Sequence, residues 1–375
     1  MALQLGDSKT WLCDTEKTTS IAHPIKFTTR TCNRHKKQTT TVRLCPLAKK
    51  VKKMSKPIKK TVIIFLDTDK HASPFDILTA VDLFPDAQIL SYSNVAPEDS
   101  KRIIQDAMFP RGPEGAKQTK LFIGGYDVEK AVEILEIAKK SMFPPFELTV
   151  IVDPRGAYTT ASAAVGKTLS ALMEKNLGDF EGKTVTVLAG TGPVGQVASR
   201  LYAMEGANVI VTSRDLARST ALAHKINAET TTERVRGVKA ASGHEVGEAI
   251  KDSHVILSAG AAGIALLPRA ALEEFGSNCK VVADINAIPP LGVEGLKPND
   301  ENAELMPGMY GIGALAIGTF KNKIEAQLFK RAVESPKGVF DYKVAYEVAK
   351  LVVLEKLKKN KQQSPGESGR NLLPF

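Results

Sequence analysis

Short apolar runs alternate with amphipathic segments along the chain from residue 61 onward. The runs are rich in β-branched residues, which is typical of buried parallel strands. In the first part of this region they are 61–67, 87–93, 119–125 and 146–152. They are separated by segments with apolar residues at helical spacing, at 75–84, 97–109 and 127–142. Strands that alternate with helices predict right-handed βαβ units and a parallel sheet.

A helical segment at 160–176 leads into a second series of the same kind. Its predicted strands are 183–189, 208–213, 254–259 and 280–284, and its predicted helices are 193–206, 215–228, 244–252 and 268–275. Two helices, at 313–334 and 341–359, close the pattern. The second has an apolar face that must pack on another element. Packing on the first α/β unit would satisfy this face and leave a cleft between the two units.

The pattern predicts the α/β fold class with two domains. We expect an N-terminal α/β substrate domain over 54–160 and a Rossmann-type dinucleotide-binding domain over 161–312. The helices of 313–360 are expected to return to the first domain. Residues 361–375 are polar and are expected to form a flexible tail.

The formal net charge of +10 belongs to one end of the chain. Residues 1–60 hold 15 Lys and Arg and only three acids, whereas the remaining residues hold 36 bases and 38 acids, a net of −2. A nucleic-acid partner for the folded part is therefore not expected. Residues 1–53 lack hydrophobic periodicity, so we expect a disordered basic extension or a mis-assigned start before Met54.

Composition also excludes several classes of protein. No apolar run approaches the roughly 18 residues that a membrane span needs, so no membrane partner is expected. Four Cys cannot form a disulfide framework in a chain of 375 residues, and those in 1–53 match no paired zinc spacing, so no metal site is predicted. Residues 1–53 do not read as a secretory signal, although their composition is compatible with an organellar transit peptide. We expect a cytoplasmic protein.

The clearest chemical motif is Gly190-Thr191-Gly192-Pro193-Val194-Gly195, which follows a predicted strand and opens a predicted helix. In a dinucleotide-binding turn the first glycine permits the tight turn, the second lets the backbone approach a pyrophosphate, and the third lets helix and strand pack closely. Pro193 suits the first helical position, and the helix N-terminus supplies donors to phosphates. The motif therefore predicts that residues 190–195 bind a dinucleotide; the alternative is a glycine turn without a ligand.

The end of the next strand indicates which dinucleotide. A cofactor with a free ribose 2′-OH usually meets an acid about 20 residues after the motif. Here the strand runs into Ser213 and Arg214, and Asp215 is better placed as a helix N-cap. A hydroxyl and a guanidinium suit a 2′-phosphate. The sequence favours NADP over NAD, with NAD still possible.

Further candidates follow other strands, whose carboxyl ends line the ligand crevice in this kind of fold. In the second domain, Ala259 and Gly260 would let a cofactor lie close, and Asn286 could bond a nicotinamide amide or a substrate. In the first domain the candidates are Asp67, Asp69, Gly124, Gly125, Asp153, Thr159 and Thr160. Ser73 is expected to cap a helix that begins at Pro74. Ordinary turn chemistry is the competing explanation for each residue.

Seven segments taken together resemble one known family. They are DTD…SPFD (67–76), FIGG (122–125), VDPRGAYTTASAA (152–164), LAGTGPVG (188–195), SAGAAGIALLP (258–268), VVADINAIPPLG (281–292) and GALAIGTFK (313–321). This combination resembles the methylene-tetrahydromethanopterin dehydrogenases of methylotrophic bacteria. The resemblance covers about 58–350 in consistent order and leaves 1–53 unaccounted for.

The resemblance implies a fold similar to that of methylene-tetrahydrofolate dehydrogenases, with the pterin in the interdomain cleft. It implies hydride transfer from methylene-tetrahydromethanopterin to NADP or NAD, which gives methenyl-tetrahydromethanopterin in one-carbon metabolism. The glycines of 190–195 would hold the pyrophosphate, Ser213 and Arg214 the 2′-phosphate, and Lys321 would match the lysine that the family places near the reaction centre. The tyrosine–lysine pair of the folate enzymes has no obvious counterpart. We also expect a homo-oligomer.

This reaction needs alignment more than it needs catalytic groups. Hydride leaves a carbon between two nitrogens whose lone pairs stabilise the resulting cation, so proximity and orientation carry most of the catalysis. Asp67 or Asp69 could stabilise the developing charge or anchor pterin amino groups. Lys321 would oppose a nearby cation, so we expect it to position the substrate or to have a lowered pKa.

Other functions remain open at this point. One is a methylene-tetrahydrofolate dehydrogenase. Another is a dehydrogenase of the shikimate or amino-acid type, for which Lys70 is the available candidate base. The third is a nucleic-acid or regulatory binder that acts through the basic N-terminus.

Overall fold

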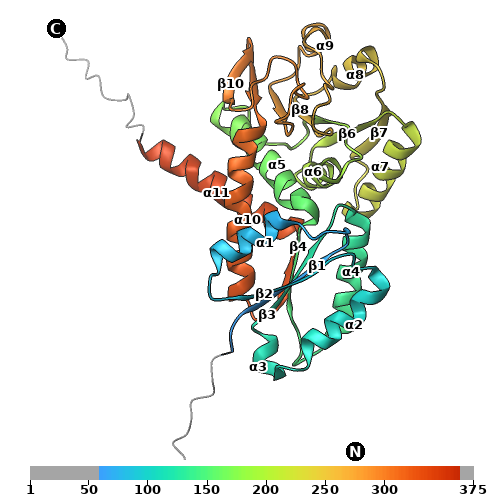
Figure 1. The fold of residues 1–375 in the computed structure, drawn as a ribbon. Helices are drawn as coiled ribbons and strands as arrows, with labels where there is room; N and C mark the ends of the chain where they lie inside the picture. The colour runs from blue at the N-terminus through green and yellow to red at the C-terminus, as the bar shows by residue number, and fades with distance from the viewer. Residues whose placement is uncertain (1–58, 364–375) are drawn as a thin grey trace, which may run out of the picture. The chain divides into compact units, whose positions relative to one another are not determined.

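The structure is a computed structural model that describes residues 59–363 of the chain. The predictions for 1–53, and for the tail from 364 on, lie outside these residues. Within the described range the chain forms two β-sheets connected by helices (Figure 1). No helix in this range is long and apolar enough to cross a membrane.

The first sheet has five parallel strands in the order β12-β4-β3-β1-β2. Their bounds are Val62–Asp67 for β1, Gln88–Tyr92 for β2, Thr119–Gly124 for β3, Thr149–Val152 for β4 and Gly338–Phe340 for β12. β1, β3 and β4 are buried along almost their whole length, which explains their unbroken apolar runs. β2 lies at the edge of the sheet, and most of its residues are exposed.

The connections of this sheet contain short amphipathic helices. They are α1 (Pro74–Leu83), α2 (Pro97–Met108), α3 (Gly112–Ala116) and α4 (Val128–Ser141). In α4 the physical basis is clear, since Asp127 caps the helix by accepting the backbone N–H groups of Glu129 and Lys130. Its apolar residues recur at helical spacing and form the buried face.

The second sheet follows the order β10-β11-β9-β8-β5-β6-β7. Its strands are β5 (Thr184–Leu188), β6 (Asn208–Ser213), β7 (Val235–Lys239), β8 (Val255–Ser258), β9 (Val281–Asp284), β10 (Glu301–Met306) and β11 (Met309–Ile312). Neighbouring strands are parallel except for the antiparallel pair β10–β11. The order β7-β6-β5-β8-β9 is that of a Rossmann-type sheet.

The crossovers of the second sheet are again helical. They contain α6 (Pro193–Met204), α7 (Leu216–Thr230), α8 (Gly243–Ile250) and α9 (Arg269–Phe275). α6 begins with Pro193 in its first turn, as the sequence predicts. α8 begins with a reciprocal capping box between Ser242 and Glu245.

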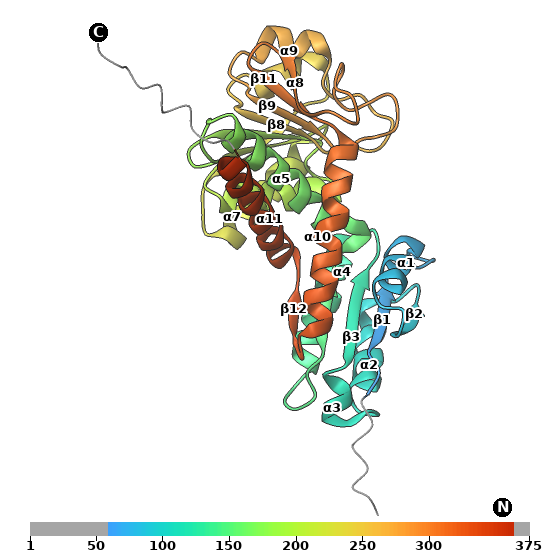
Figure 2. The same cartoon turned by 90° about the vertical axis from the view of Figure 1, so that its left-hand side faces the viewer.

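Three long helices join the two sheets: α5 (Ala157–Glu174), α10 (Ala314–Glu334) and α11 (Tyr342–Gln363). α5 is buried over most of its length and packs on α6, α10 and α11. Between α10 and α11 the chain forms β12 (Figure 2). This strand pairs with β4 through the register Val339↔Val150. The last part of the chain therefore returns to the first sheet.

The α/β fold class with a Rossmann-type sheet is confirmed, but the sequence pattern missed β7, β10, β11, β12 and α3. β10 and β7 lie at the edges of the second sheet and are mostly exposed or half-buried, so they lack an apolar run. β12 has only three residues. α11 also continues to Gln363, three residues into the segment that was expected to be a tail.

The topology places the candidate residues at two switch points. In the first sheet the strand order reverses between β1 and β3, and in the second between β5 and β8. Ligands of open parallel sheets bind outside the carboxyl ends of the strands at such a point. These four strands end at Asp67, Gly124, Leu188 and Ser258, and the predicted motifs lie at or directly after these ends.

Candidate active site

The carboxylate of Asp67 folds the loop after β1. One of its oxygens accepts the backbone N–H of Asp69 at 2.8 Å, and the other accepts that of Ser73 at 2.9 Å. The side chain is buried, so these bonds replace the water that it has lost. Ser73 is the N-cap residue of α1 as predicted, but its side chain makes no capping hydrogen bond.

Asp69 ties this loop to two others. Its Oδ1 accepts the backbone N–H of Tyr126 at 3.0 Å, and its Oδ2 accepts hydrogen bonds from the guanidinium of Arg155. Tyr126 follows β3, and Arg155 lies in the short 3₁₀ turn η2 (Pro154–Gly156) after β4. One carboxylate therefore connects the ends of three neighbouring strands.

Gly124 and Gly125 let the end of β3 approach the loop after β1. The backbone at Gly125 has a φ of +110°, and a Cβ there would lie 1.9 Å from Thr68 Oγ1. A Cβ at Gly124 would meet Asp67 Oδ2 at 3.4 Å. Position 125 thus needs glycine for both its conformation and its space.

Asp153 organises the start of α5. It accepts the backbone N–H groups of Tyr158 at 2.8 Å and Thr159 at 3.2 Å, and the Thr159 hydroxyl at 2.6 Å. Burial raises the pKa of this carboxyl, while Lys321 and the bonds from Thr159 act to lower it. Thr160, also predicted for the site, is half-buried at the next position of α5.

Lys321 reaches the same region from α10. Its Nζ donates a hydrogen bond to Glu325 Oε2 at 2.5 Å and lies 4.2 Å from the centroid of the Phe75 ring. A Cβ at Gly156 would lie 3.4 Å from Nζ, so η2 passes beside the ammonium. The Lys321 side chain is 9% exposed and that of Glu325 is 2% exposed. α10 therefore brings a buried ion pair to the strand ends of the first sheet.

Three buried carboxyl groups surround this lysine. Burial, with the nearby Asp153, raises the pKa of Asp76 to about 6, and a hydrogen bond from the Ser73 side chain partly opposes that rise. Burial raises the pKa of Glu325 to about 7 in spite of Lys321. Asp76 Oδ1 and Glu325 Oε1 have no hydrogen-bond partner among the described residues. Because the carboxyls outnumber the lysine, part of this cluster holds a proton near neutral pH.

Sequence reasoning missed two members of this cluster. Asp76 stood in the SPFD segment but was not proposed for the site, because a polar residue in the first turn of a helix has a ready structural explanation. Glu325 was not noticed at all. The available signal was its position four residues after Lys321 in a predicted helix, a spacing that places both side chains on one face. Such pairs are common on exposed helices, and only tertiary packing buries this one.

A cavity of about 290 Å³ opens beside the cluster. Its lining residues come from α1 and the residue before it, from η2 and from α10; they are Ser73, Phe75, Asp76, Arg155, Gly156 and Lys321. The Phe75 side chain is well exposed, so an aromatic face is available to a ligand. A flat heterocycle can contact this ring while its polar edge meets the carboxyl and guanidinium groups.

The glycine turn after β5 has the spacing that its motif predicts. A Cβ at Gly195 would lie 2.6 Å from Gly190 Cα, so α6 packs directly on the turn. A Cβ at Gly190 would meet Val211 at 2.8 Å. At Gly192, in contrast, the nearest atoms to a Cβ are carbonyl oxygens at 3.7 and 3.8 Å, which leaves a hollow that a side chain would fill. Residues 190–195 therefore fit a dinucleotide pyrophosphate, held by Gly192 and the first N–H groups of α6.

A second cavity, of about 560 Å³, lies between this turn, α7 and the segment that joins β3 to α4. Its walls include Thr191, Gly192 and Pro193 from the turn, residues 126–129 from the start of α4, and Arg218 from α7. Tyr126 thus lines this cavity, and Arg155 lines the smaller one. Because Asp69 binds both residues, it links the walls of the two cavities.

Ser213 and Arg214 stand at the end of β6. Ser213 is buried, and its hydroxyl accepts the N–H of Asp215 at 3.2 Å. Asp215 caps α7 as predicted, by accepting the N–H of Ala217 at 2.9 Å. The acid beside the strand end is therefore occupied as a cap, and Arg214 is exposed next to it.

Asn286 holds two loops of the second sheet together. Its Oδ1 accepts the N–H groups of Gly263 at 3.2 Å and Ile288 at 2.9 Å, and its Nδ2 donates to the carbonyl of Pro290 at 3.0 Å. One side-chain N–H remains for a ligand. A Cβ at Gly260 would lie 2.5 Å from Leu266 Cδ1, so packing within the protein already requires a small residue there. Contacts of Ala259, Gly260 and Asn286 with a cofactor stay predictions.

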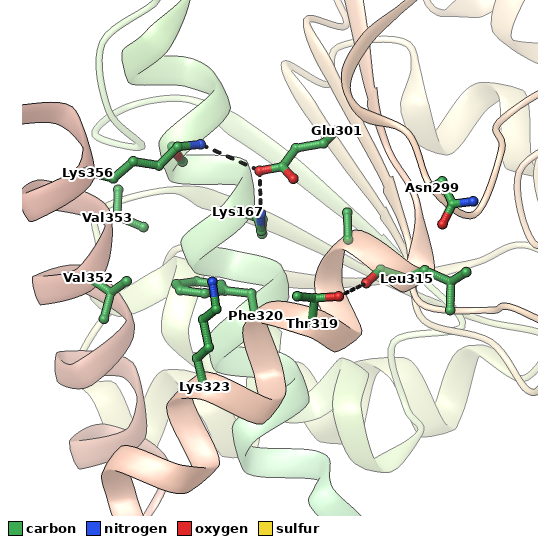
Figure 3. A pocket seen from close by; sticks show the side chains of 12 residues that line it. Lys167, Asn299, Glu301, Leu315, Thr319, Phe320, Lys323, Val352, Val353 and Lys356 are labelled. Atoms are coloured by element: carbon green, nitrogen blue, oxygen red, sulfur yellow. Dashed lines mark hydrogen bonds and ion pairs between the residues drawn. The ribbon is translucent and has the colours of Figure 1, made fainter. Parts of the chain in front are cut away.

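A separate cavity, of about 330 Å³, is enclosed by α5, α10, α11 and β10 (Figure 3). It faces Leu315, Thr319 and Lys323, which lie on a different side of α10 from Lys321. Lys167 and Lys356 both point to Glu301, with Nζ–Oε1 distances of 2.6 and 3.5 Å. Lys356 Nζ also pairs with Glu174 Oε1 at 3.1 Å, so two carboxylates match these two lysines. We therefore place the candidate active site at the other two cavities.

The fold and the site define an α/β protein with two largely parallel sheets, the second of Rossmann type and with a dinucleotide-type glycine turn. Two relatives from Methylorubrum extorquens strain AM1 match the chain over nearly their whole length. "Bifunctional protein MdtA" is 35% identical and covers 78% of this chain and 99% of its own, and "NAD(P)-dependent methylenetetrahydromethanopterin dehydrogenase" is 33% identical and covers 77% and 98%. The chain belongs to the family of the NAD(P)-dependent methylenetetrahydromethanopterin dehydrogenases, which confirms the resemblance seen in its motifs.

Two family models match separate parts of the chain. Residues 74–155 match the N-terminal region of methylene-tetrahydromethanopterin dehydrogenase, and residues 171–294 match shikimate/quinate 5-dehydrogenase. Among solved structures, shikimate 5-dehydrogenase from Listeria monocytogenes in complex with shikimate and NAD is 14% identical, covers 74% of this chain and 95% of its own, and has a TM-score of 0.47. A likeness of this degree carries no functional argument.

Proposed function

We propose that this chain transfers a hydride from methylene-tetrahydromethanopterin to NADP and releases methenyl-tetrahydromethanopterin. Membership of the family supports the reaction, since the relative that carries this activity in its name aligns over 98% of its own length. The observation that carries the proposal within the molecule is the pair of cavities joined by Asp69. One is lined by the aromatic side chain of Phe75 and the buried carboxyl of Asp76, and the other has the open glycine turn.

The pterin belongs, on this proposal, in the smaller cavity. The face of Phe75 would pack on the ring system, and Asp76 and Arg155 would meet its polar edge. Asp69 would position Arg155, and Asp67 would act through the shape and negative charge of its loop, because both of its oxygens already accept N–H groups. Asp153 with Thr159, and the glycines at 124–125, would hold the surrounding turns in place. Thr160 would stand at the border of the site.

The dinucleotide belongs at the glycine turn. Residues 190–195 and the N-terminus of α6 would bind the pyrophosphate, and Ser213 with Arg214 would bind the 2′-phosphate. Bound NADP supplies the hydride acceptor. The residues after β8 and β9, among them Ala259, Gly260 and Asn286, would form the floor against which the nicotinamide is oriented.

The chemistry asks the protein to align the methylene carbon and to exclude water. As the hydride leaves, positive charge spreads over the two flanking nitrogens of the pterin. The cluster of Asp76, Asp153 and Glu325 contains more carboxyls than the single Lys321 can neutralise, so its field favours that charge. No residue of the chain needs to act as a nucleophile in this scheme.

We also propose that the protein is a cytoplasmic homo-oligomer. Exposed apolar side chains support self-association, since Leu78 and Val81 on α1 are both more than 40% exposed, and so are Leu90 and Tyr92 on the edge strand β2. Light scattering coupled to size-exclusion chromatography would test this, and a monomer mass at micromolar concentration would contradict it.

The function is tested by an assay of reduced-nicotinamide absorbance with four substrate pairs. These combine methylene-tetrahydromethanopterin or methylene-tetrahydrofolate with NADP or NAD. We expect the highest kcat/KM for the methanopterin–NADP pair. A higher value with the folate substrate would make the chain a methylene-tetrahydrofolate dehydrogenase. No absorbance with any pair would overturn the proposal, and shikimate and amino acids with NADP would then be assayed.

A further inference from the structure

We infer that Glu325 is a positioning residue for this reaction, one that neutralises the Lys321 ammonium and fixes it against Phe75, so that the site accepts the positive charge that forms on the substrate. The inference rests on the proposed function. Glu325 lines neither of the two cavities of the site, and it would act through Lys321.

The Lys321–Glu325 ion pair is short and buried. The two side chains lie one helical turn apart on α10, with 2.5 Å between Lys321 Nζ and Glu325 Oε2. Lysine has several rotatable bonds, so an ammonium at this depth keeps one position only if a partner holds it. In the described part of the chain Glu325 is the carboxylate that lies within ion-pair distance of this ammonium.

The neighbouring carboxyls are committed to other contacts. Asp153 already accepts three hydrogen bonds from Tyr158 and Thr159. Asp76 lies on α1 and receives the Ser73 side chain. The charged and titratable groups that face Glu325 are Lys321 from its own helix, Asp153 from the end of β4 and Asp76 from α1. Without Glu325, the ammonium at the cavity wall would keep the Phe75 ring but would have no carboxylate of the described residues within ion-pair distance.

An unpaired ammonium matters in this reaction because the product carries a positive charge. Charges in a water-poor site interact far more strongly than in bulk water, so a free ammonium at the cavity wall would oppose formation of the methenyl cation. Tetrahydromethanopterin without the one-carbon unit has the same ring system but no such cation. Loss of Glu325 is therefore expected to weaken the cationic ligand selectively.

The experiment measures dissociation constants of methenyl-tetrahydromethanopterin and tetrahydromethanopterin on the full chain, together with kcat and the KM for NADP. Glu325→Gln keeps the shape of the side chain and removes its charge. Glu136→Gln is the matched control, because it removes an exposed carboxylate that pairs with Lys139 at 2.8 Å on α4. We expect Glu325→Gln to weaken methenyl binding at least 10-fold more than tetrahydromethanopterin binding. Glu325→Gln should also lower kcat about 10-fold and leave the KM for NADP unchanged. Glu136→Gln should change neither kcat nor the relative affinity for the two pterin ligands.

Equal weakening of both ligands, or no change, would overturn the inference and leave the proposed function standing. Failure of the wild-type protein to bind either ligand would instead overturn the proposed function. A measurement on the wild type keeps the inference testable if Glu325→Gln does not fold. From pH 5 to 7 the preference for the methenyl ligand should rise as the buried carboxyls lose their protons, and a flat profile would contradict the role of this pair.

Discussion

At the scale of single residues, the site depends on side chains whose partners fix their chemistry. Asp215 and Arg214 are adjacent in the sequence, yet one is used as a helix cap and the other is exposed at the end of β6. The sequence shows only that both side chains are polar. The hydrogen bond that Asp215 makes as a helix cap leaves Arg214 available to a ligand. The proposed preference for NADP therefore rests on a contact that Asp215 makes within the protein.

Arg214→Ala should raise the KM for NADP by about 10- to 100-fold, because a charge-assisted hydrogen bond to a phosphate contributes roughly 1.5–3 kcal/mol. The KM for NAD should change less than 2-fold, since NAD has no 2′-phosphate. Steady-state kinetics with both cofactors measure the effect. Arg102→Ala, at an exposed arginine of α2, is the control and should change neither KM. An equal rise for NAD and NADP would remove Arg214 from the 2′-phosphate site.

Gly125→Ala should destabilise the protein by about 2–4 kcal/mol. The positive φ of Gly125 disfavours any side chain, and the new Cβ would also overlap Thr68 Oγ1. Gly308→Ala separates the two causes, because Gly308 has a φ of +73° but no atom within 4 Å of a Cβ. Urea denaturation should show that Gly308→Ala lowers the free energy of unfolding by about 1–2 kcal/mol. Equal losses of unfolding free energy in the two variants would mean that the close approach to Thr68 does not contribute to the effect at Gly125.

At the scale of secondary-structure elements, the first sheet depends on contacts between segments that are distant in the sequence. β12 completes the first sheet beside β4, and Lys120 on β3 secures the place where α10 ends. The fully buried Lys120 Nζ donates hydrogen bonds to the carbonyls of Lys117 at 2.7 Å and Ser335 at 2.5 Å, and to Thr149 Oγ1 at 3.2 Å. A charged group thus holds the end of α10 against the sheet.

This lysine predicts a dependence of stability on pH. Burial lowers its pKa to about 8, so between pH 8 and 10.5 the folded state releases a proton that the unfolded state still binds. The free energy of unfolding of the wild type, relative to Lys120→Met, should therefore rise across this window by about 3 kcal/mol. Lys139→Met, at a half-exposed lysine of α4, is the control and should show no such rise. A difference that stays constant with pH would contradict the lowered pKa.

The sequence patterns predicted strands well where almost every residue of the strand is buried. They failed where a strand depends on pairing with a neighbouring strand. β1, β3 and β4 were found because both of their faces are covered and their sequences are apolar throughout. β10 alternates irregularly and is stabilised by its antiparallel neighbour β11. β12 is recognisable only from its pairing with β4, a contact between segments distant in sequence that local periodicity cannot reveal.

The same distinction applies to the site. The shape of the glycine turn was predictable because it depends on consecutive residues whose roles are steric, and its binding of a dinucleotide stays a prediction. The carboxyl cluster was only half predictable, since Asp76, Asp153, Lys321 and Glu325 come from three separate segments. Asp153 and Lys321 were found through strand ends and family motifs. Asp76 and Glu325 acquire their unusual protonation only from burial, which is a property of the folded chain.

At the scale of the whole molecule, ionisation of the buried carboxyls lowers the stability of the fold. The pKa of Asp76 rises to about 6 on folding, so between pH 4 and 6 the folded state keeps a proton that the unfolded state has lost. The free energy of unfolding should therefore fall as pH rises through this window, by about 2 kcal/mol for this residue. Glu325 should extend the fall to about pH 7.

Asp76→Asn removes the Asp76 part of this effect and isolates it. Relative to the variant, the wild type should lose stability between pH 4 and 6 and then remain level. Chemical denaturation at several pH values measures the difference. The exposed Asp82→Asn on α1 serves as the control. A wild type that gains stability relative to Asp76→Asn over this range would show that Asp76 is ionised more easily in the folded state.

The return of the chain to its first sheet has a consequence for synthesis on the ribosome. β4 ends at Val152, but its neighbour β12 begins only at Gly338, and Lys321 comes only slightly earlier. While the intervening residues are translated, the edge of β4 lacks its final partner and the site lacks its lysine. A nascent chain released early would therefore have a glycine turn but no complete active site. We therefore expect activity only after α10 and β12 have emerged from the ribosome.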